Sequence, residues 1–498
     1  MQNYMKSTDF GMLVLCFVIS TVLRTEFIMV NVLNTIDSYL YYPVLIIVLI
    51  AGGLYFSGRI KFAQIRLFGE SVRVVMEKPE GDNQVSSFQA LMVSTASRVG
   101  TGNIIGVSTA VVLGGPGAIF WMWLLAIIGG ASAFVESTLA QIYKHGDKKN
   151  GCYGGPGYYI ESALHKKGLA TLFVLFLIAT YAFGFNLLCS YNLQSTFAVY
   201  DFYNEKTTPL IIGIVIAILV GICIMGGGKK IVKVTGVLVP FMGAAYVLIS
   251  LIVIIVHIKA LPSVFVMIFS DAFDFKSIFS GVAGSCMVYG IKRGLYSNEA
   301  GVGSAPNAAA SAMVSHPVKQ GLVQMLSVYI DTLLICTATA LMCVFSGVPR
   351  TADSAGAPYV QAAISTVFGK YGPTFITIAM LMFAFTTLLG NLYYVDNALA
   401  FLNHKKMPGK KFMTCWRIIC CLVVVVGAVI PMDAAWALAD ITMGGMALIN
   451  IPVCIAIGGV VYKALDDYMK QKKAGLNPVF HARDIGMDPS ELNFWGDE

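Results

Sequence analysis

Long unbroken apolar segments constrain the fold of this chain more than any other feature. The stretch "LIIGIVIAILVGICIMGG", residues 210–227, is one of several that are long enough to cross a hydrocarbon core of ~30 Å as a helix. The composition agrees, because 57% of the 498 residues are hydrophobic and 12% are charged, whereas soluble domains carry roughly a quarter charged residues. Strands of a membrane barrel would alternate in polarity instead. We therefore predict an all-α polytopic membrane protein.

About eleven segments of the chain have the length and composition of a membrane span. The loop after the first of them, residues 60–80, mixes Phe62, Ile65, Leu67 and Phe68 with basic side chains, which is typical of an amphipathic helix on a membrane surface. The predicted spans are residues 41–59, 87–112, 118–142, 170–196, 209–226, 235–257, 275–302, 317–346, 372–401, 412–431 and 434–462.

The basic residues predict how these spans are oriented. Of the 34 Lys and Arg residues, 23 lie in loops or in the C-terminal tail on one side of this topology, and five lie on the other side. Because cytoplasmic loops are enriched in Lys and Arg, we place the basic loops and the C-terminus in the cytoplasm. The net charge of +7 then reflects orientation and not a nucleic-acid-binding patch. We expect the lysine-rich segment 463–473 to be a solvated cytoplasmic end.

The predicted spans and loops divide the chain into five parts. Residues 10–23 are apolar but short, and Arg24 and Glu26 follow them. We interpret this stretch as an upstream extension, because Met29 would make a natural start; a signal-like segment and an extra helix are the alternatives. Residues 1–40 are accordingly the N-terminal extension of the chain. The other parts are residues 41–86 for the first span and the surface helix, 87–258 and 259–462 for two five-helix units, and 463–498 for the tail.

Two glycines interrupt the second span within "SRVGTGNIIGVSTA", residues 97–110. Glycine lowers helix stability by about 1 kcal/mol relative to alanine, and free backbone groups in lipid cost several kcal/mol each. A break at Gly100–Thr101–Gly102–Asn103 must therefore line a cavity enclosed by protein. Close helix packing is the alternative, because Gly102 and Gly106 form a small-xxx-small pattern.

A second interruption follows five spans later, in "YGIKRGLYSNEAGVGSAPNAAAS", residues 289–311, where Gly290 and Gly294 flank Lys292 and Arg293. Matching interruptions in two units of opposite topology are typical of inverted-repeat transporters. Unwound segments expose carbonyl groups to a cation and N–H groups to a carboxylate. A zwitterionic amino acid and Na⁺ suit such a site.

Four motifs resemble the alanine or glycine:cation symporter family: "VGTGNIIGVSTAVVLGGPGAIFWMW", "GIKRGLYSNEAGVGSAP", "HPVKQGLVQMLSVYIDT" and "GGPGYYIESAL". The resemblance extends from about residue 40 to residue 460. It implies a multi-pass protein of the bacterial or archaeal plasma membrane that imports a small neutral amino acid, alanine or glycine, with Na⁺ by alternating access. It also implies a LeuT-like fold, with one N-terminal helix before a five-plus-five inverted-repeat core.

The resemblance also implies a set of substrate-binding residues. Thr101, Gly102 and Asn103 would hold the substrate carboxylate with their amides and side chains. Gly290 would mark the matching break in the second unit, and Asn298 lies on the inner half of that span. The family has a glutamine near the pocket in the fourth span, which matches Gln194, but Thr196 stands where relatives often have an asparagine.

For the ion, the shared fold has a site between the first broken helix and the eighth core helix. The segment "FAFTTLLG" supplies the hydroxyls of Thr386 and Thr387, which would join the carbonyls of Ala96 and Val99 as Na⁺ ligands. Ordinary back-bonding of Thr within a helix is the alternative. Farther along the same span, Asn391 stands where the family often has tryptophan, so the pocket size can differ.

Arg98 also departs from many relatives. A guanidinium in a span needs a partner, and Glu136, Glu299 and Asp331 are acidic residues in apolar spans. We favour an ion pair of Arg98 with Asp331 or Glu136 that locks the scaffold. The alternative is that Arg98 alters cation coupling.

Other functions remain as alternatives. Within the transporter class, these are an H⁺-coupled carrier or a glutamine-type carrier of the same fold. An intramembrane enzyme is less favoured, because the six histidines lie in loops, in the tail or at span ends. We expect Na⁺ as the coupling ion, no organic cofactor, no nucleic-acid partner and a monomeric protein in the bilayer.

Overall fold

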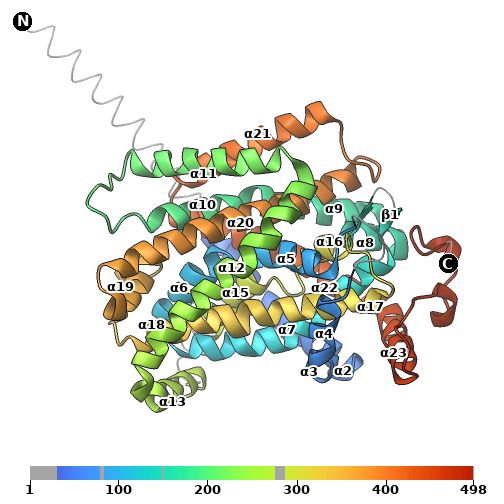
Figure 1. Ribbon diagram of the computed structural model, residues 1–498, viewed down its shortest axis with the longest axis horizontal. Helices are drawn as coiled ribbons and strands as arrows, with labels where there is room; N and C mark the ends of the chain where they lie inside the picture. The colour runs from blue at the N-terminus through green and yellow to red at the C-terminus, as the bar shows by residue number, and fades with distance from the viewer. Residues whose placement is uncertain (1–30, 79–83, 148–150, 275–285, 497–498) are drawn as a thin grey trace, which may run out of the picture.

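A computed structural model describes residues 31–78, 84–147, 151–274 and 286–496 of the chain (Figure 1). The interpretation of residues 10–23 lies outside the described residues, as does the start of the span predicted at 275–302. Within the described residues, seven helices are long and apolar enough to cross a membrane. They are Asn31–Arg59 (ending in α2, Ile46–Arg59), Gly117–Ile142 (α7), Lys167–Ser195 (α9, Lys167–Ile178, and α10, Phe185–Ser195), Gly227–Val256 (α12), Pro317–Phe345 (α17, Pro317–Val328, and α18, Thr337–Phe345), Tyr371–Leu402 (α20) and Met432–Ile457 (α22).

The remaining predicted spans are also helical. Two are single helices, α11 (Thr208–Ile224) and α21 (Lys410–Gly427). The other two are interrupted: α5 (Ser87–Arg98) is followed by α6 (Val107–Leu113), and α15 (Cys286–Asn298) is followed by the short α16 (Pro306–Ala309). The connecting elements are α3 (Ala63–Arg66), α4 (Phe68–Val75), β1 (His145–Asp147), β2 (Gly151–Tyr153), α8 (Pro156–Leu164), α13 (Leu261–Ala272), α19 (Ala357–Phe368) and α23 (Gly459–Lys473).

The interrupted helices lie inside the bundle. Helix α7 packs along α15 and α17, and α5 packs against α12 and α20. Helices α11 and α21 pack on each other at one side of the molecule, where Figure 1 shows them at the top of the view. The broken segments are thereby enclosed by other helices, which satisfies the requirement that irregular backbone at membrane depth be covered by protein.

Local sequence signals set where the central helices begin. Helix α5 starts with a capping box, in which Gln89 N donates to Ser86 Oγ at 3.1 Å and Ser86 N donates to Gln89 Oε1 at 3.0 Å. Helix α17 has Pro317 in its first turn, and His316 Nδ1 accepts a hydrogen bond from Val318 N at 3.2 Å. Both starts are therefore specified by residues just outside the apolar segments.

The predicted surface helix is present as two short helices, α3 and α4. Phe62, Ile65 and Phe68 are exposed, whereas Leu67 is buried. The exposed apolar side chains form the face that an interfacial helix would insert into a membrane surface.

The chain beyond the lysine-rich segment 463–473 is docked on the helix bundle. After α23, the chain folds back on the ends of the helices, and both Phe480 and Trp495 are buried. Phe480 N donates to the main-chain oxygen of Ser315 at 2.9 Å, and Trp495 Nε1 donates to the main-chain oxygen of Gln141 at 2.9 Å. The tail therefore ties α23 to the ends of α7 and α17.

Truncating Trp495 tests whether the tail contributes to stability. We expect Trp495→Ala to lower the melting temperature of the detergent-solubilised protein clearly, because losing a buried tryptophan costs ~3–5 kcal/mol. Leu476→Ala in the same tail is the matched control, since Leu476 is 60% exposed. Equal melting temperatures for the two variants would contradict the observed docking of the tail.

Candidate functional site

The first broken helix is interrupted where the glycines predicted it. Helix α5 ends at Arg98, and Val99 has a non-helical backbone with φ −76° and ψ 86°. The chain then continues as a wide turn of π-helix at Gly102–Gly106 before α6 begins. The predicted break within Gly100–Asn103 is confirmed, with its edge one residue earlier, at Val99.

Two glycines at this break allow close contact with neighbouring helices. A Cβ atom on Gly100 would lie 2.2 Å from Thr387 Oγ1 in α20, and one on Gly102 would lie 2.5 Å from the ring of Tyr296 in α15. No real Cβ atom tolerates such distances. The glycines therefore bring the unwound backbone into direct contact with α20 on one side and α15 on the other.

The prediction that Gly290 marks the second break is wrong. Helix α15 runs through Gly290 and Gly294 without interruption and ends at Asn298. A Cβ atom on Gly290 would lie 2.5 Å from the main-chain oxygen of Ala118, so Gly290 serves close packing against α7. The chain between α15 and α16 is unwound instead, where Glu299 and the following glycines adopt positive φ angles. These angles are +52° at Glu299, +83° at Gly301 and +89° at Gly303.

Asn103 links the first break to a buried carboxylate. Its Oδ1 accepts from Gly100 N at 2.8 Å, and its Nδ2 donates to Asp331 Oδ1 at 2.7 Å. The other oxygen of Asp331 accepts from Ser297 Oγ at 2.7 Å and from Thr332 Oγ1 at 2.9 Å. Gly100, Asn103, Ser297, Asp331 and Thr332 are all buried. These oxygen atoms form a set that a hard cation such as Na⁺ prefers, and Asp331 was not among the predicted ion ligands.

Only one of the two predicted threonines reaches the first broken helix. Thr387 Oγ1 donates to the main-chain oxygen of Ala96 at 3.1 Å. Thr386 Oγ1 bonds within its own helix, to Met382 O at 3.0 Å, and contacts Met242 Sδ in α12. Thr387 therefore contacts Ala96, close in the chain to Val99. The Thr386 hydroxyl instead donates to a carbonyl of its own helix, which is the alternative stated above for a threonine in a helix.

Asn192, and not Gln194, contacts the first break from α10. Asn192 Nδ2 donates to Thr101 Oγ1 at 3.1 Å, and Asn192 Oδ1 has no hydrogen-bond partner within the described part of the chain. Gln194 Oε1 accepts instead from the hydroxyl of Tyr203 at 2.9 Å. Residues two apart point to different faces of a helix, so the two amides cannot both face Thr101.

Asn298 stabilises the start of the second break. Its Nδ2 donates to Thr332 Oγ1 at 3.3 Å, and its Oδ1 accepts from Ala300 N at 3.0 Å. Asn298 is fully buried. Through Thr332, it connects the unwound segment to the same helix that carries Asp331.

Aromatic side chains cover the first break. The ring of Tyr296 lies 4.6 Å from the ring of Phe185 and 4.9 Å from that of Trp436, measured between centroids. The Arg293 guanidinium stacks on Trp436 at 3.6 Å, and Arg293 Nη1 lies 3.5 Å from Asp440 Oδ2. We call Phe185, Tyr296 and Trp436 the aromatic cover.

Asn391, which stands where relatives often have tryptophan, faces α5. Its Oδ1 accepts from Ser97 Oγ at 2.7 Å, and its Nδ2 donates to Asn186 Oδ1 at 2.9 Å. The amide thus links α5, α10 and α20 through hydrogen bonds.

The expected ion pair of Arg98 with Asp331 or Glu136 is wrong. Among the described residues, Arg98 forms no ion pair: its Nη1 donates to the main-chain oxygen of Gln324 at 3.3 Å, and its Nε and Nη2 have no hydrogen-bond partner. Neutral donors bind the expected partners instead: Asn103 binds Asp331, and Asn450 Nδ2 donates to Glu136 Oε2 at 2.7 Å.

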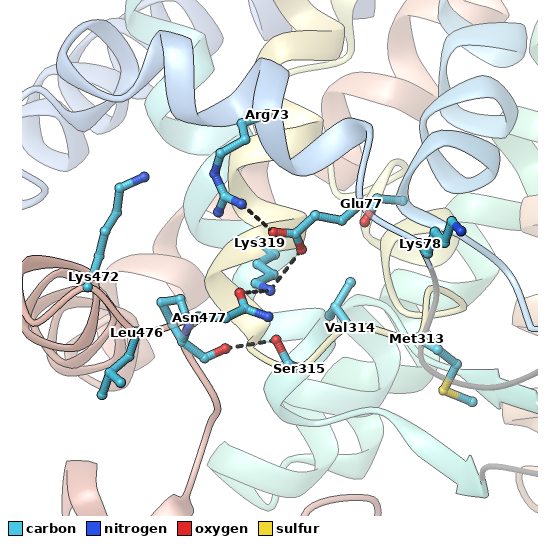
Figure 2. A pocket seen from close by; sticks show the side chains of 13 residues that line it. Arg73, Glu77, Lys78, Met313, Val314, Ser315, Lys319, Lys472, Leu476 and Asn477 are labelled. Atoms are coloured by element: carbon cyan, nitrogen blue, oxygen red, sulfur yellow. Dashed lines mark hydrogen bonds and ion pairs between the residues drawn. The ribbon is translucent and has the colours of Figure 1, made fainter.

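Both breaks are closed off in this conformation. Thr101, Asn103 and Asn298 are each at most 1% exposed. A cavity of about 550 Å³ lies elsewhere, between α4, the start of α17 and the tail (Figure 2). Its lining contains no residue of either break; there, Lys319 Nζ donates to Glu77 Oε2 and to Asn477 Oδ1, both at 2.8 Å.

Comparisons with known proteins agree with this geometry. Residues 25–482 match the family model described as "Sodium:alanine symporter family". The chain is 42% identical to the amino-acid carrier protein AlsT of Bacillus subtilis, covering 94% of this chain and 98% of AlsT. It is 41% identical to the probable sodium/glutamine symporter GlnT of the same organism, covering 94% and 96%. It is 36% identical to the sodium/alanine symporter AgcS of Methanococcus maripaludis, covering 89% and 98%.

A solved structure shares the fold. The crystal structure of MhsT in complex with L-phenylalanine superposes with a TM-score of 0.50 at 14% identity, covering 84% of this chain and 95% of that chain. The likeness confirms the LeuT-like fold that the family resemblance implies.

Proposed function

Because the chain belongs to the sodium:alanine symporter family, we propose that it imports a small neutral amino acid, alanine or glycine, together with Na⁺ by alternating access. The observation that carries the proposal is the unwound segment at Val99–Gly100, followed by the π-helical turn at Gly102–Gly106 and enclosed between α10, α15 and α20. The positive-inside pattern supports a cytoplasmic C-terminus. We further propose that the monomer is the working unit.

The first break supplies the groups that a zwitterionic amino acid needs. The turn that begins at Gly102 starts a helix, and helix N-termini favour carboxylates. Thr101 and Asn103 place a hydroxyl and an amide beside this position. The unpartnered Oδ1 of Asn192 is a buried acceptor next to Thr101, so it suits the substrate ammonium group. Gln194 and Asn298 would act farther out, through Tyr203 and Thr332.

The aromatic cover limits the substrate to a small side chain. Tyr296 lies directly on Gly102, and Trp436 lies 3.6 Å from where a Cβ atom of Gly106 would be. A glutamine carrier is the second candidate, because GlnT is nearly as similar to this chain as AlsT is. The packing of the aromatic cover favours alanine or glycine.

Two oxygen-rich positions suit Na⁺. One comprises the Ala96 carbonyl and the Thr387 hydroxyl, beside Val99. The other comprises Asp331 with Asn103, to which Ser297 and Thr332 add hydroxyls. Oxygen ligands favour hard cations over softer metals.

Uptake of labelled amino acids into proteoliposomes tests the proposal. We expect an inward Na⁺ gradient to drive uptake of alanine or glycine, and unlabelled glutamine to compete weakly. Uptake that no imposed ion gradient changes would contradict the symport. Uptake driven by H⁺ or Li⁺ alone would contradict the choice of ion, and preferential uptake of glutamine would favour the second candidate.

The two adjacent threonines give a matched pair of variants. Thr387→Ala is expected to raise the Na⁺ concentration for half-maximal uptake by about 10-fold, because a lost buried hydroxyl ligand costs ~1–2 kcal/mol. Thr386→Ala removes a hydroxyl that bonds within its own helix, so we expect less than about 2-fold change. A larger effect of Thr386→Ala on the Na⁺ titration would refute this assignment of the hydroxyls.

A further inference from the structure

The cavity between α4, the start of α17 and the C-terminal tail lies outside the transport site. It encloses about 550 Å³ (Figure 2). Ligand pockets commonly measure ~300–1,000 Å³, so this space suits a small molecule or a headgroup. Neither break contributes a residue to its lining, so the proposed transport cycle does not account for it. The charged residues of the lining are Arg73, Glu77, Lys78, Lys319 and Lys472.

The carboxylates at this cavity are each shared by two cations. Arg73 Nη1 donates to Glu77 Oε1 and Arg73 Nη2 donates to Glu70 Oε1, each at 2.7 Å. Lys319 Nζ donates to the same Glu77, to Oε2 at 2.8 Å. Lys472 Nζ pairs with Glu70. These five side chains therefore already carry one more positive charge than negative charge.

Lys78 raises this excess to two positive charges. It lines the cavity and forms no ion pair within the described part of the chain. Figure 2 shows Lys78 and Lys472 on opposite sides of Lys319. Lys319 itself is 1% exposed, and a buried ammonium group is costly unless it is fully compensated. A bound anion with a charge near −2 would balance the four cations and two carboxylates.

Two helix N-termini add to the positive potential of the cavity. Ser87 is the first residue of α5, Lys319 lies in the first turn of α17, and both line the cavity. A helix N-terminus is the positive end of the helix dipole and favours anions. Ser87 Oγ accepts from Gln320 Nε2 at 2.9 Å, so its own hydroxyl hydrogen can be donated to an acceptor in the cavity.

A phosphate group fits these features better than a carboxylate does. A phosphate monoester carries about −1.5 to −2 charge at pH 7 and presents three acceptor oxygens. Lys and Arg side chains and helix N-termini are frequent partners of phosphate. A single carboxylate would leave half of the excess charge uncompensated.

We propose that this cavity is a binding site for a phosphate group, held by Lys78, Lys319 and Arg73 at the N-terminal ends of α5 and α17. The phosphate belongs either to a soluble compound or to the headgroup of an anionic lipid, since both offer the same chemistry. The ligand bridges α4, α17 and the tail, and so stabilises the docked tail. The site does not depend on the proposed symport.

The melting temperature of the detergent-solubilised protein tests this site. One arm titrates inorganic phosphate at constant ionic strength, and the other compares short-chain phosphatidic acid with short-chain phosphatidylcholine. For the unaltered protein, we expect phosphate or phosphatidic acid to raise the melting temperature to a plateau, because a ligand of the folded state stabilises it by mass action. Exclusion of phosphate from the protein surface also raises stability, but without a plateau at low concentration.

A matched pair of lysine variants locates the binding. Lys78 is exposed and unpaired within the described chain, so Lys78→Gln should keep the fold. We expect it to raise the ligand concentration for half of the shift at least ~5-fold, because a charge-assisted contact to phosphate is lost. Lys473→Gln is the control, since Lys473 is also exposed but does not line the cavity. Its half-saturation should stay within about 2-fold of that of the unaltered protein.

The outcomes distinguish the possibilities. A plateau with inorganic phosphate indicates a soluble ligand, and a plateau with phosphatidic acid alone indicates a lipid; either supports the site if Lys78→Gln weakens it selectively. No plateau in either arm for the unaltered protein overturns the inference. Weakening by Lys473→Gln that equals or exceeds that by Lys78→Gln, or no weakening by Lys78→Gln, also overturns it. Because no transport is measured here, failure of the proposed symport would appear only in the uptake assay.

Discussion

Uptake by the Asp331→Asn variant is expected to need about 100-fold more Na⁺ for half-saturation than uptake by the unaltered protein, which corresponds to ~2.8 kcal/mol. Asp331 is the charged group among the oxygens around Asn103. Asparagine has nearly the same size, so the packing around it is kept while the negative charge is lost. Hydrogen bonds and ion contacts of a charged group are roughly twice as strong as neutral ones. A Na⁺ titration of alanine uptake in proteoliposomes measures the shift.

Asp396→Asn provides the matched control. Asp396 is also a carboxylate in a long apolar helix, but it pairs with Arg417 at 3.5 Å and contacts neither break. We expect its Na⁺ half-saturation to stay within about 3-fold of that of the unaltered protein. Equal shifts for the two variants would mean that loss of any buried carboxylate perturbs the carrier, and Asp331 would lose its assigned role.

The positions of the spans and of the first break follow directly from the sequence. Apolar length determines where a helix can cross the bilayer, and Gly100 and Gly102 lie in a run that contains few other helix breakers. The structure adds why both must be glycine: Thr387 and Tyr296 approach the backbone too closely for any side chain. This contact is between segments far apart in the sequence, so periodicity alone does not reveal it.

The second break shows where such reasoning fails. A glycine in a helix serves either close packing or unwinding, and the sequence alone does not distinguish the two. Gly290 packs on α7, whereas Gly301 and Gly303 supply positive φ angles. The stronger signal was the segment "EAGVGSAP", in which two glycines and a proline follow one another within eight residues. A cluster of such residues is a better indicator of unwinding than an isolated pair.

Side-chain partners were the least predictable part of the site. The sequence indicates that Arg98 needs compensation, but not that neutral donors already bind Asp331 and Glu136. It also leaves open which amide of "YNLQ" faces the break, because that depends on the rotation of α10 about its own axis. Asn192 could have been preferred over Gln194 only with knowledge of the facing helix.

Gly102→Ala is expected to abolish Na⁺-driven uptake, whereas Gly106→Ala in the same turn should be tolerated. The Cβ atom at position 102 would lie 2.5 Å from Tyr296 Cε1, so the aromatic cover or the unwound turn must move. At position 106, the nearest atom is 3.6 Å away, an ordinary contact. Alanine favours a regular helix by about 1 kcal/mol at either position, so the pair separates steric displacement from helix propensity.

The same pair of variants tests what the break is for. If Gly102→Ala failed only because alanine promotes helix, Gly106→Ala would also lose uptake, and both would show increased stability. If the close approach of Tyr296 to the backbone is what shapes the binding site, Gly102→Ala alone loses uptake. Combining it with Tyr296→Leu, which removes the ring edge, should then recover part of the alanine binding measured by thermal shift. Uptake by Gly102→Ala equal to that by Gly106→Ala would show that the contact with Tyr296 is not needed, and the aromatic cover would no longer explain the preference for a small substrate.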